Sequence, residues 1–197
     1  MPVRGIMEVI EKIDIKRLQY EIARHRLERS YKLLFLHFHK SLTGFTLGFV
    51  KIPEVAEEIV SDVMIKLWMM QEKLDEIENL KVYLFTAVKN ASINYLKKHQ
   101  HVIEWNADNV DTHINLDLYN PEDILLKNEF RRKIAAAIRS LPSKCRQVYK
   151  LVREDGFSYK EVASILEISE NTVDRHLNIA LHKLTESVRT YLAGGHH

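Results

Sequence analysis

The sequence predicts an all-α protein of two small helical domains joined by an acidic flexible linker, with a helix-turn-helix in the C-terminal domain. Three observations predict this fold class. The 197 residues include only six Gly and four Pro, and runs of β-branched residues are few, which favours helices nearly throughout. The charge changes sign along the chain. Near the C-terminus, apolar residues recur at spacings of three and four between two helix-start signals.

The charge pattern divides the chain. Residues 15–100 carry 14 Lys and Arg against 10 Asp and Glu, and residues 124–193 carry 13 against 8. Residues 101–123 carry six acidic residues and no Lys or Arg, and they lack helical periodicity. The predicted units are an N-terminal extension over 1–28, expected to be helical; a first helical domain over 29–100; an acidic linker over 101–121; a second helical domain over 122–193; and a tail over 194–197 that resembles a cloning remnant.

In the first domain, residues 56–68 form an amphipathic helix whose outer side is mixed. Ile65 and Met69 stand there beside Glu58, Asp62 and Lys66. A solvent-facing helix usually avoids such an apolar and acidic stripe. Either another helix of the same domain covers the stripe, or a partner protein docks on it, and the sequence leaves both interpretations open.

A turn over residues 75–79 leads to a further predicted helix over 79–98, in which basic and amide residues alternate with aromatic ones. They are Lys81, Tyr83, Phe85, Lys89, Asn90, Asn94, Tyr95, Lys97 and Lys98. Basic groups can follow phosphates, and aromatic rings can stack on exposed bases. The same segment also supplies core residues such as Leu84 and Val88, so by itself this pattern is a weak indication of single-strand binding.

The second domain is predicted to start with a helix after Pro121, which ends at Leu141 and Pro142. A helix with Cys145 inside follows and leads to a turn over residues 154–156. The helix-turn-helix comes next.

This helix-turn-helix occupies residues 158–184. Ser158 and Glu161 form a capping box for its first helix, and Ser169 can cap the second. The second helix has an apolar side at Val173, Leu177, Ala180, Leu181 and Leu184. Its outer side carries Asn171, Thr172, Asp174, Arg175, His176, Asn178 and His182. Short or planar hydrogen-bonding groups suit base edges in a major groove, so we predict DNA binding; a plain helical hairpin with a polar side is the alternative.

Several classes of function find no support. The single cysteine, Cys145, excludes an intramolecular disulfide and suits a reducing, cytoplasmic compartment. No secretory signal is visible, and no uncharged run reaches the roughly 20 residues of a membrane span. Two histidine pairs are spaced i, i+2, which does not place them on one helix face, so no metal site is expected. Without a Gly-rich phosphate loop or a nucleophile elbow, we expect neither a cofactor nor an enzyme.

From about residue 31 to residue 191, the chain resembles the extracytoplasmic-function (ECF) class of bacterial RNA polymerase sigma factors. Residues 56–68, 79–85 and 90–97 are similar to the second region of that family, and residues 141–184 to its fourth region. The two blocks stand in the family's order and spacing.

The resemblance implies a protein that binds core RNA polymerase, directs it to specific promoters and initiates transcription. Docking on the clamp helices of the β′ subunit would involve Glu58, Ser61, Asp62 and Ile65. Melting of the −10 element and capture of a flipped base would involve Asn79, Lys81, Tyr83, Lys89 and Asn90. Recognition of the −35 duplex would involve Asn171, Thr172, Asp174, Arg175, His176 and Asn178. The acidic linker would thread the RNA exit path, and an anti-sigma factor is a further expected partner, with no membrane insertion of this chain.

Two alternatives remain at this stage. Residues 168–177 also resemble the helix-turn-helix of LuxR-type regulators, which bind duplex DNA without being polymerase subunits, although the first domain lacks the strands of a receiver domain. A helical adaptor that binds only proteins would need neither the outward Arg175 and Asn178 nor the basic and aromatic segment.

Overall fold

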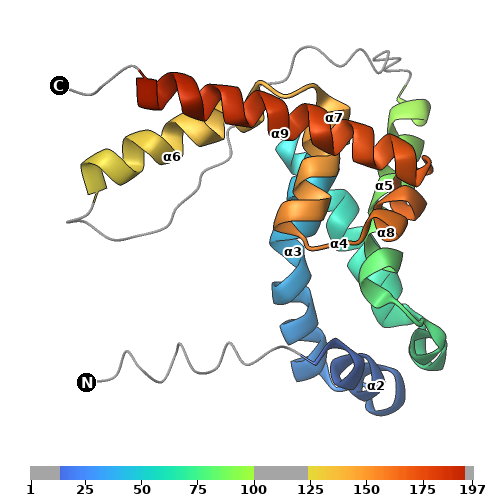
Figure 1. The fold of residues 1–197 in the computed structure, drawn as a ribbon. Coiled ribbons are helices and arrows are strands. Elements are labelled where there is room, and N and C mark those ends of the chain that lie inside the picture. Colours follow the sequence, from blue (N-terminus) through green and yellow to red (C-terminus); the bar gives the residue numbers. More distant parts are fainter. Residues whose placement is uncertain (1–13, 100–123, 194–197) are drawn as a thin grey trace, which may run out of the picture.

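A computed structural model describes residues 14–99 and 124–193, and every regular element within these ranges is a helix (Figure 1). The all-α prediction is confirmed. The linker expected over 101–121 and the tail over 194–197 lie outside the described residues, as do residues 1–13. The elements are α2 (Ile15–His25), α3 (Glu28–Val50), α4 (Pro53–Met69), the 3-10 helix η1 (Gln71–Glu76), α5 (Leu80–Lys98), α6 (Ile124–Arg139), α7 (Ser143–Tyr149), the π-helical turn η2 (Lys150–Glu154), α8 (Tyr159–Leu166) and α9 (Glu170–Ala193).

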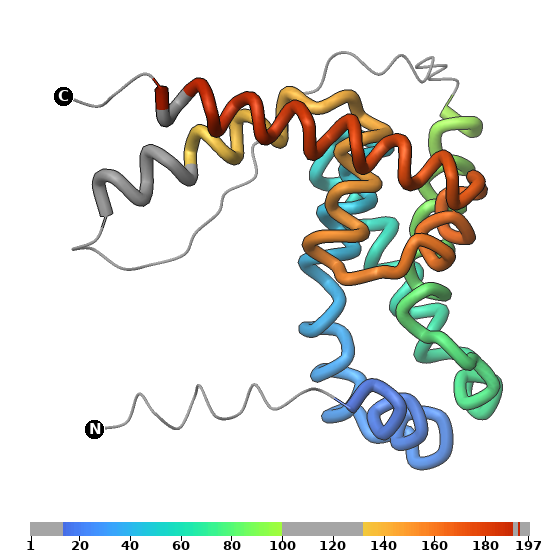
Figure 2. The backbone as a smooth tube through the Cα atoms, viewed as in Figure 1, coloured from blue at the N-terminus to red at the C-terminus, as the bar shows by residue number. Residues whose placement is uncertain are grey.

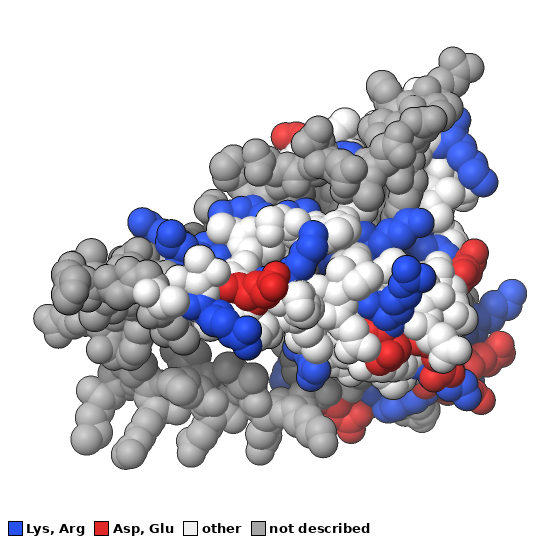
Figure 3. Space-filling view, turned by 45° about the horizontal axis from the view of Figure 1, so that its top comes forward, with Lys and Arg blue, Asp and Glu red and all other residues white. Residues whose placement is uncertain are grey.

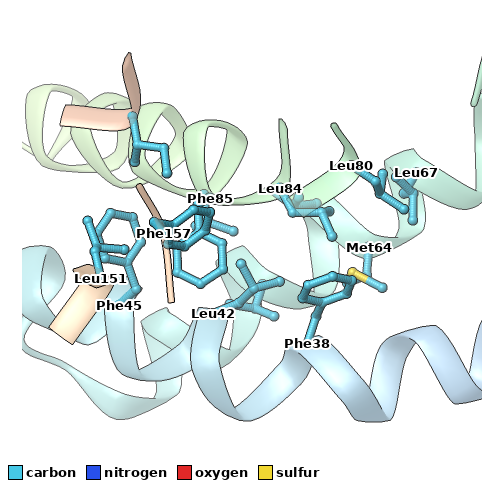
Figure 4. Close-up of a cluster of buried hydrophobic side chains, with 14 of the residues drawn as sticks. Phe38, Leu42, Phe45, Met64, Leu67, Leu80, Leu84, Phe85, Leu151 and Phe157 are labelled. Carbon is cyan, nitrogen blue, oxygen red and sulfur yellow. The ribbon is translucent and has the colours of Figure 1, made fainter. Parts of the chain in front are cut away.

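Helix α3 is the central element of the first helical unit, which comprises α2 to α5. Its buried residues recur every three or four positions, and α2, α4 and α5 pack around it. The buried side chains include Leu34, Phe38, Leu42, Phe45 and Phe49. Figure 4 shows Phe38 and Leu42 of α3 beside Met64 of α4, with Leu80 and Leu84 of α5 above them. The repeat fixes which side of α3 faces the core.

Local signals set the ends of the helices in this unit. Pro53 stands in the first turn of α4, where the backbone N–H of any residue would have no partner within the helix. Proline, which has no N–H, therefore loses no hydrogen bond there. The Asn79 side chain caps α5 by accepting a hydrogen bond from the Val82 backbone N–H at 3.1 Å. Helix α5, which carries the basic and aromatic segment, therefore begins directly after Asn79, at the start that the sequence predicts.

Helix α2 packs into the first unit, although the sequence assigns it to an extension. Gln19 is fully buried, and its Nε2 donates to the backbone carbonyls of Leu74 at 2.6 Å and Ile77 at 2.8 Å. The Leu74 carbonyl also accepts from the Ile77 N–H within η1, so Gln19 adds a second hydrogen bond there and ties α2 to the end of this turn. Leu18 and Ile22 join the same core. The helix expected within residues 1–28 is therefore present over Ile15–His25 and shares the core of α3 and η1.

The second helical unit, α6 to α9, has a small core of its own. Ala137, Leu141 and Cys145 of its first part pack against Ala180 and Leu184 of α9. Helix α7 runs into the π-helical turn η2, and the chain then reverses at Gly156, whose φ of 69° favours glycine. The turn expected over residues 154–156 is present.

One hydrophobic core continues from the first unit into the second. The ring centroids of Phe157 and Phe85 are 4.8 Å apart, and those of Phe85 and Phe45 are 5.2 Å apart. Leu151 belongs to the same cluster, as Figure 4 shows. Figure 2 shows α8 beside α5, with the start of α9 close by. The two helical units are therefore in direct contact in this structure.

Close approach of α3 to α7 depends on Gly48. A Cβ at this position would lie 3.0 Å from Nε2 of Gln147, which is tighter than ordinary van der Waals contact. The absence of a side chain allows the two helices to touch.

We predict that Leu42→Ala lowers the free energy of unfolding by about 2–5 kcal/mol, because it leaves a cavity at a fully buried site of α3. Leu36→Ala on the same helix is the matched control, since Leu36 is 62 % exposed and its loss should change stability by about 0.5 kcal/mol or less. Urea denaturation followed by circular dichroism measures both. Equal losses would contradict the assignment of the buried side of α3.

Candidate nucleic-acid interface

The helix-turn-helix is built by two helix caps. In the capping box of α8, the Ser158 backbone N–H donates to the Glu161 carboxylate at 2.8 Å, and the Glu161 N–H donates to Ser158 Oγ at 3.3 Å. The first of these hydrogen bonds is the main reason why the pKa of Glu161 is lowered. At the next helix, the Thr172 N–H donates to Ser169 Oγ at 3.1 Å. Both predicted helix starts are confirmed.

Packing between the two helices fixes which side of α9 faces outward. Val173 and Leu177 are buried on α9, and Val162 and Ile165 are buried on α8 in the same core cluster. These contacts fix α9 against α8, so the outer side chains of α9 keep a set orientation relative to the rest of the protein.

Of the six −35 candidates, four are exposed and two are half-buried. Asn171, Asp174, Arg175 and Asn178 are exposed. Nδ2 of Asn178 donates to the Asp174 carboxylate at 3.0 Å, so the acidic residue orients the amide. The outer side of α9 thus presents a cation one turn of the helix beyond Asn171 and an oriented amide two turns beyond it.

The two half-buried candidates make local contacts instead. The Thr172 hydroxyl lies 2.8 Å from Ser169 Oγ and takes part in the cap of α9. Nδ1 of His176 lies 3.4 Å from Sγ of Cys145, which is buried. Burial lowers the pKa of His176, and the nearby Lys144 and Arg175 lower it further. Both effects favour the neutral form of the His176 imidazole, whose Nδ1 faces Cys145.

The five −10 candidates lie on α5 and at its start, and three of them contact the second helical unit. Nδ2 of Asn79 donates to Glu161 Oε1 at 2.8 Å. Lys81 donates to the backbone carbonyl of Asp155, and its ammonium lies 4.2 Å from the centre of the Phe157 ring. Lys89 is only 3 % exposed.

The partner of Lys89 is Glu167, whose Oε1 lies 2.7 Å from the ammonium. Hydrogen bonding from Lys89, followed by its charge, lowers the pKa of Glu167. The remaining candidates, Tyr83 and Asn90, are exposed. Phe85, by contrast, is fully buried and belongs to the core.

The acidic partners of α5 carry no signal in the sequence. Asp155, Glu161 and Glu167 look like ordinary surface acids beside the helix-turn-helix, and they lie 74 to 82 residues from the groups that they bind. Only a knowledge of which helices touch could have identified them.

The predicted docking stripe on α4 is open. Ile65 is 51 % exposed and Met69 is 70 % exposed, while Glu58 and Asp62 are exposed beside them and Ser61 is half-buried. No other helix within residues 14–99 and 124–193 covers the stripe, which favours partner docking over an internal contact. An exposed apolar stripe edged by acids is typical of a protein-binding surface.

Figure 3 shows the charges on the face that carries α9. Lysine and arginine are spread across the described part of this face, and most of the acidic side chains gather at its lower right edge. Within residues 14–99 and 124–193, no group of three or more His, Cys, Asp or Glu could hold a metal ion. None of the helices in those ranges combines the length and the apolar character needed to cross a bilayer.

Two family models match the chain. The model for Sigma-70 region 2 matches residues 34–102, and the model for Sigma-70 region 4 matches residues 131–184, so that together they cover more than half of the sequence. The order agrees with the resemblance of the two predicted domains. A LuxR-type regulator would not explain the region 2 match.

Curated relatives support the same family. The chain is 22 % identical over 181 residues to the ECF RNA polymerase sigma factor RpoE of Cereibacter sphaeroides, covering 89 % of this chain and 96 % of the relative. It is 24 % identical over 153 residues to the ECF RNA polymerase sigma-E factor of Escherichia coli, covering 74 % of this chain and 80 % of the relative.

Solved structures show the same fold. The sigma factor RpoE from Bartonella quintana, solved in complex with the anti-sigma factor NepR, matches with a TM-score of 0.58 at 23 % identity over 82 % of this chain and 98 % of that chain. CnrH, solved with the cytosolic domain of CnrY, matches with a TM-score of 0.53 at 19 % identity over 89 % of this chain and 97 % of that chain. With regions 2 and 4 in order on one helical chain, and relatives matched over most of their length, this protein belongs to the ECF family of RNA polymerase sigma factors.

Proposed function

We propose that this sigma factor, which directs RNA polymerase to promoters, holds core polymerase with α4 and contacts two promoter elements with α5 and α9. The observation that carries the proposal is the outer side of α9. It presents Arg175 and an Asn178 amide oriented by Asp174, on a helix fixed by two caps and a buried stripe. Sigma factors act as transcription initiation factors rather than as catalysts, and the mechanism proposed here is one of binding.

The −35 element is read as duplex by α9. An arginine can donate two hydrogen bonds to guanine, and an asparagine amide can pair with adenine, in the major groove. The hydrogen bond to Asp174 favours one orientation of the Asn178 amide, which reduces the entropy lost on binding. Thr172 and His176 support this surface through the cap and through the contact with Cys145.

The −10 element is opened and held by α5. Tyr83 supplies an exposed ring on which a base can stack, and Asn90 supplies an exposed amide. Lys81 and Lys89 would contact phosphates once they leave their present partners in the second unit. Asn79 stands at the start of α5, where it can contact a base displaced from its stack.

Core polymerase supplies the affinity that each DNA contact lacks. Docking through Glu58, Asp62 and Ile65 would bring both DNA-binding helices to one promoter at high effective concentration. The free chain is expected to bind promoters weakly. This mode of action places the protein in the cytoplasm with the polymerase, and an anti-sigma factor is a proposed further partner, as for the relatives whose complexes are solved.

We predict that Arg175→Ala and Asn178→Ala each reduce transcription from a matched −35 sequence by about tenfold or more, because a base-specific pair contributes about 1–3 kcal/mol. His182→Ala is the control, since His182 is an exposed residue of the same helix outside the proposed set. In vitro transcription from a library of −35 variants measures the effect. Equal loss at every promoter would argue against base reading.

We predict that Asp62→Lys combined with Ile65→Lys weakens binding to core RNA polymerase by about 100-fold or more, since the few dominant residues of an interface contribute about 2–4 kcal/mol each. Leu36→Lys on α3 is the matched control for placing a charge at an exposed apolar site. Size-exclusion co-elution and fluorescence anisotropy measure the affinity. Unchanged affinity with an intact circular dichroism spectrum would contradict the docking surface.

A further inference from the structure

Gln19 of α2 places a buried amide beside the turn over residues 75–79, which leads to Asn79. The Gln19 side chain is fully buried, and its Nε2 donates to the carbonyls of Leu74 at 2.6 Å and Ile77 at 2.8 Å. These two hydrogen bonds use both N–H groups of the amide. Ile77 ends η1, and Asn79 caps α5 two residues later. The amide therefore holds the backbone just before a −10 candidate.

Both carbonyls that Gln19 contacts also have another donor. The Leu74 carbonyl accepts from the Ile77 N–H at 3.3 Å, and the Ile77 carbonyl accepts from Nζ of Lys16 at 2.9 Å. Loss of the Gln19 amide would therefore leave neither carbonyl unpaired. The need to satisfy buried backbone groups does not explain why an amide stands at position 19.

The amide also carries a cost that an apolar side chain would avoid. Within residues 14–99 and 124–193, no hydrogen-bond partner lies near Oε1 of Gln19, which is buried. A buried polar atom without a partner lowers stability. The neighbouring Leu18 and Ile22 belong to the hydrophobic core, so an apolar side chain would fit the surroundings of α2. Stability alone favours an apolar residue here, and the geometry imposed on the turn is the remaining reason for the amide.

Two cations of α2 hold the same turn from its outer side. Lys16 is exposed and reaches the Ile77 carbonyl. Arg24 donates from Nε and from Nη2 to Asp75 Oδ2, each at 3.3 Å. Side chains of a single helix therefore fix the path of the turn from Asp75 to Ile77.

The path of this turn decides where Asn79 lies. Only Glu78 stands between the fixed Ile77 carbonyl and Asn79, so a shift of one moves the other. On its other side, Asn79 is tied to α5, because its Oδ1 accepts from the Val82 N–H at 3.1 Å. A side chain that distinguishes between bases has to be held within about 0.5 Å of its working position. The hold of α2 on the turn meets that requirement.

We propose that Gln19 is a positioning residue for −10 recognition, because it holds the turn so that Asn79 meets a displaced base in one geometry. The proposal rests on the proposed function, since it assumes that Asn79 contacts the −10 strand. Gln19 is fully buried and does not touch DNA itself. Its loss should reduce discrimination between −10 bases and leave core binding and −35 preference unchanged.

The variant Gln19→Met tests the proposal, because methionine is unbranched and flexible like glutamine but donates no hydrogen bond. Full-length variants bound to core RNA polymerase transcribe a promoter library with a randomised −10 element. The base ratio is the use of the preferred base over the next one, at the position where the wild-type chain discriminates most. We expect Gln19→Met to lower the base ratio by about tenfold. Its midpoint of thermal unfolding should stay within about 3 °C of wild type.

The control for loss of stability is Leu42→Ala, which removes a fully buried side chain of α3 in the same helical unit. It should lower the unfolding midpoint more than Gln19→Met and keep the wild-type base ratio. Transcription is measured below the unfolding temperature of every variant. An equal fall of the base ratio in Leu42→Ala would overturn the positioning role, because the ratio would then follow stability.

A matched pair on the surface of α2 gives a second test that leaves the core intact. Lys16 and Arg17 are adjacent and exposed, and each change to methionine removes one positive charge. Of the two, Lys16 bonds to the turn, whereas Arg17 pairs with Glu21. We expect Lys16→Met to lower the base ratio by about twofold or more and Arg17→Met to leave it unchanged. Equal base ratios would contradict the proposal, and this pair decides the case in which Gln19→Met does not fold.

A change at Asn79 separates the inference from the proposed function. Asn79→Ser keeps an oxygen that can cap α5 but removes the amide. If Asn79→Ser loses the base preference and folded Gln19→Met keeps it, the proposed function stands and the positioning role is wrong. If Asn79→Ser keeps the preference, Asn79 does not read the −10 strand and the inference fails with that assignment.

Discussion

Burial of Phe157 is the interaction on which most of the structure depends. Gly156, with its φ of 69°, turns the chain so that the Phe157 N–H donates to the Leu151 carbonyl at 3.0 Å and its ring enters the core beside Phe85. The next residue, Ser158, then begins α8 through its capping box. One short segment therefore sets both the direction of the helix-turn-helix and its contact with α5. A change in this turn would disturb both units together.

The ion pair between Lys89 and Glu167 determines how the two helical units are aligned more than it stabilises their contact. Removing an ammonium from water is unfavourable, and a single hydrogen-bonded carboxylate offsets that loss only in part. Leaving Lys89 buried without its partner would be worse, so any packing of the two units that separates the pair is disfavoured. The apolar centre around Phe157 tolerates small shifts, whereas the ion pair accepts a narrow range of positions. Together they define one arrangement of the units.

Local features of the fold could be predicted from the sequence. The caps at Ser158 and Ser169, the turn at Gly156 and the buried stripe of α9 each follow from residues within a few positions of one another. Contacts between distant segments could not be predicted. The basic and aromatic alternation of α5 holds no sign that Lys89 is buried, because its carboxylate partner lies 78 residues away. For the same reason the sequence assigns Gln19 to an extension, although its side chain donates to the carbonyls of Leu74 and Ile77 at the end of η1.

Glu167 ends α8 in the left-handed conformation, at φ 56°, where glycine is the usual residue because it has no Cβ to crowd the backbone. A glycine there would relieve the strain of the turn, yet it would remove the carboxylate that holds Lys89. The tightness of the helix-turn-helix and the grip between the two units therefore cannot both be optimised at this position. A Glu167→Gly variant would therefore gain a less strained turn and lose the ion pair that joins the two units.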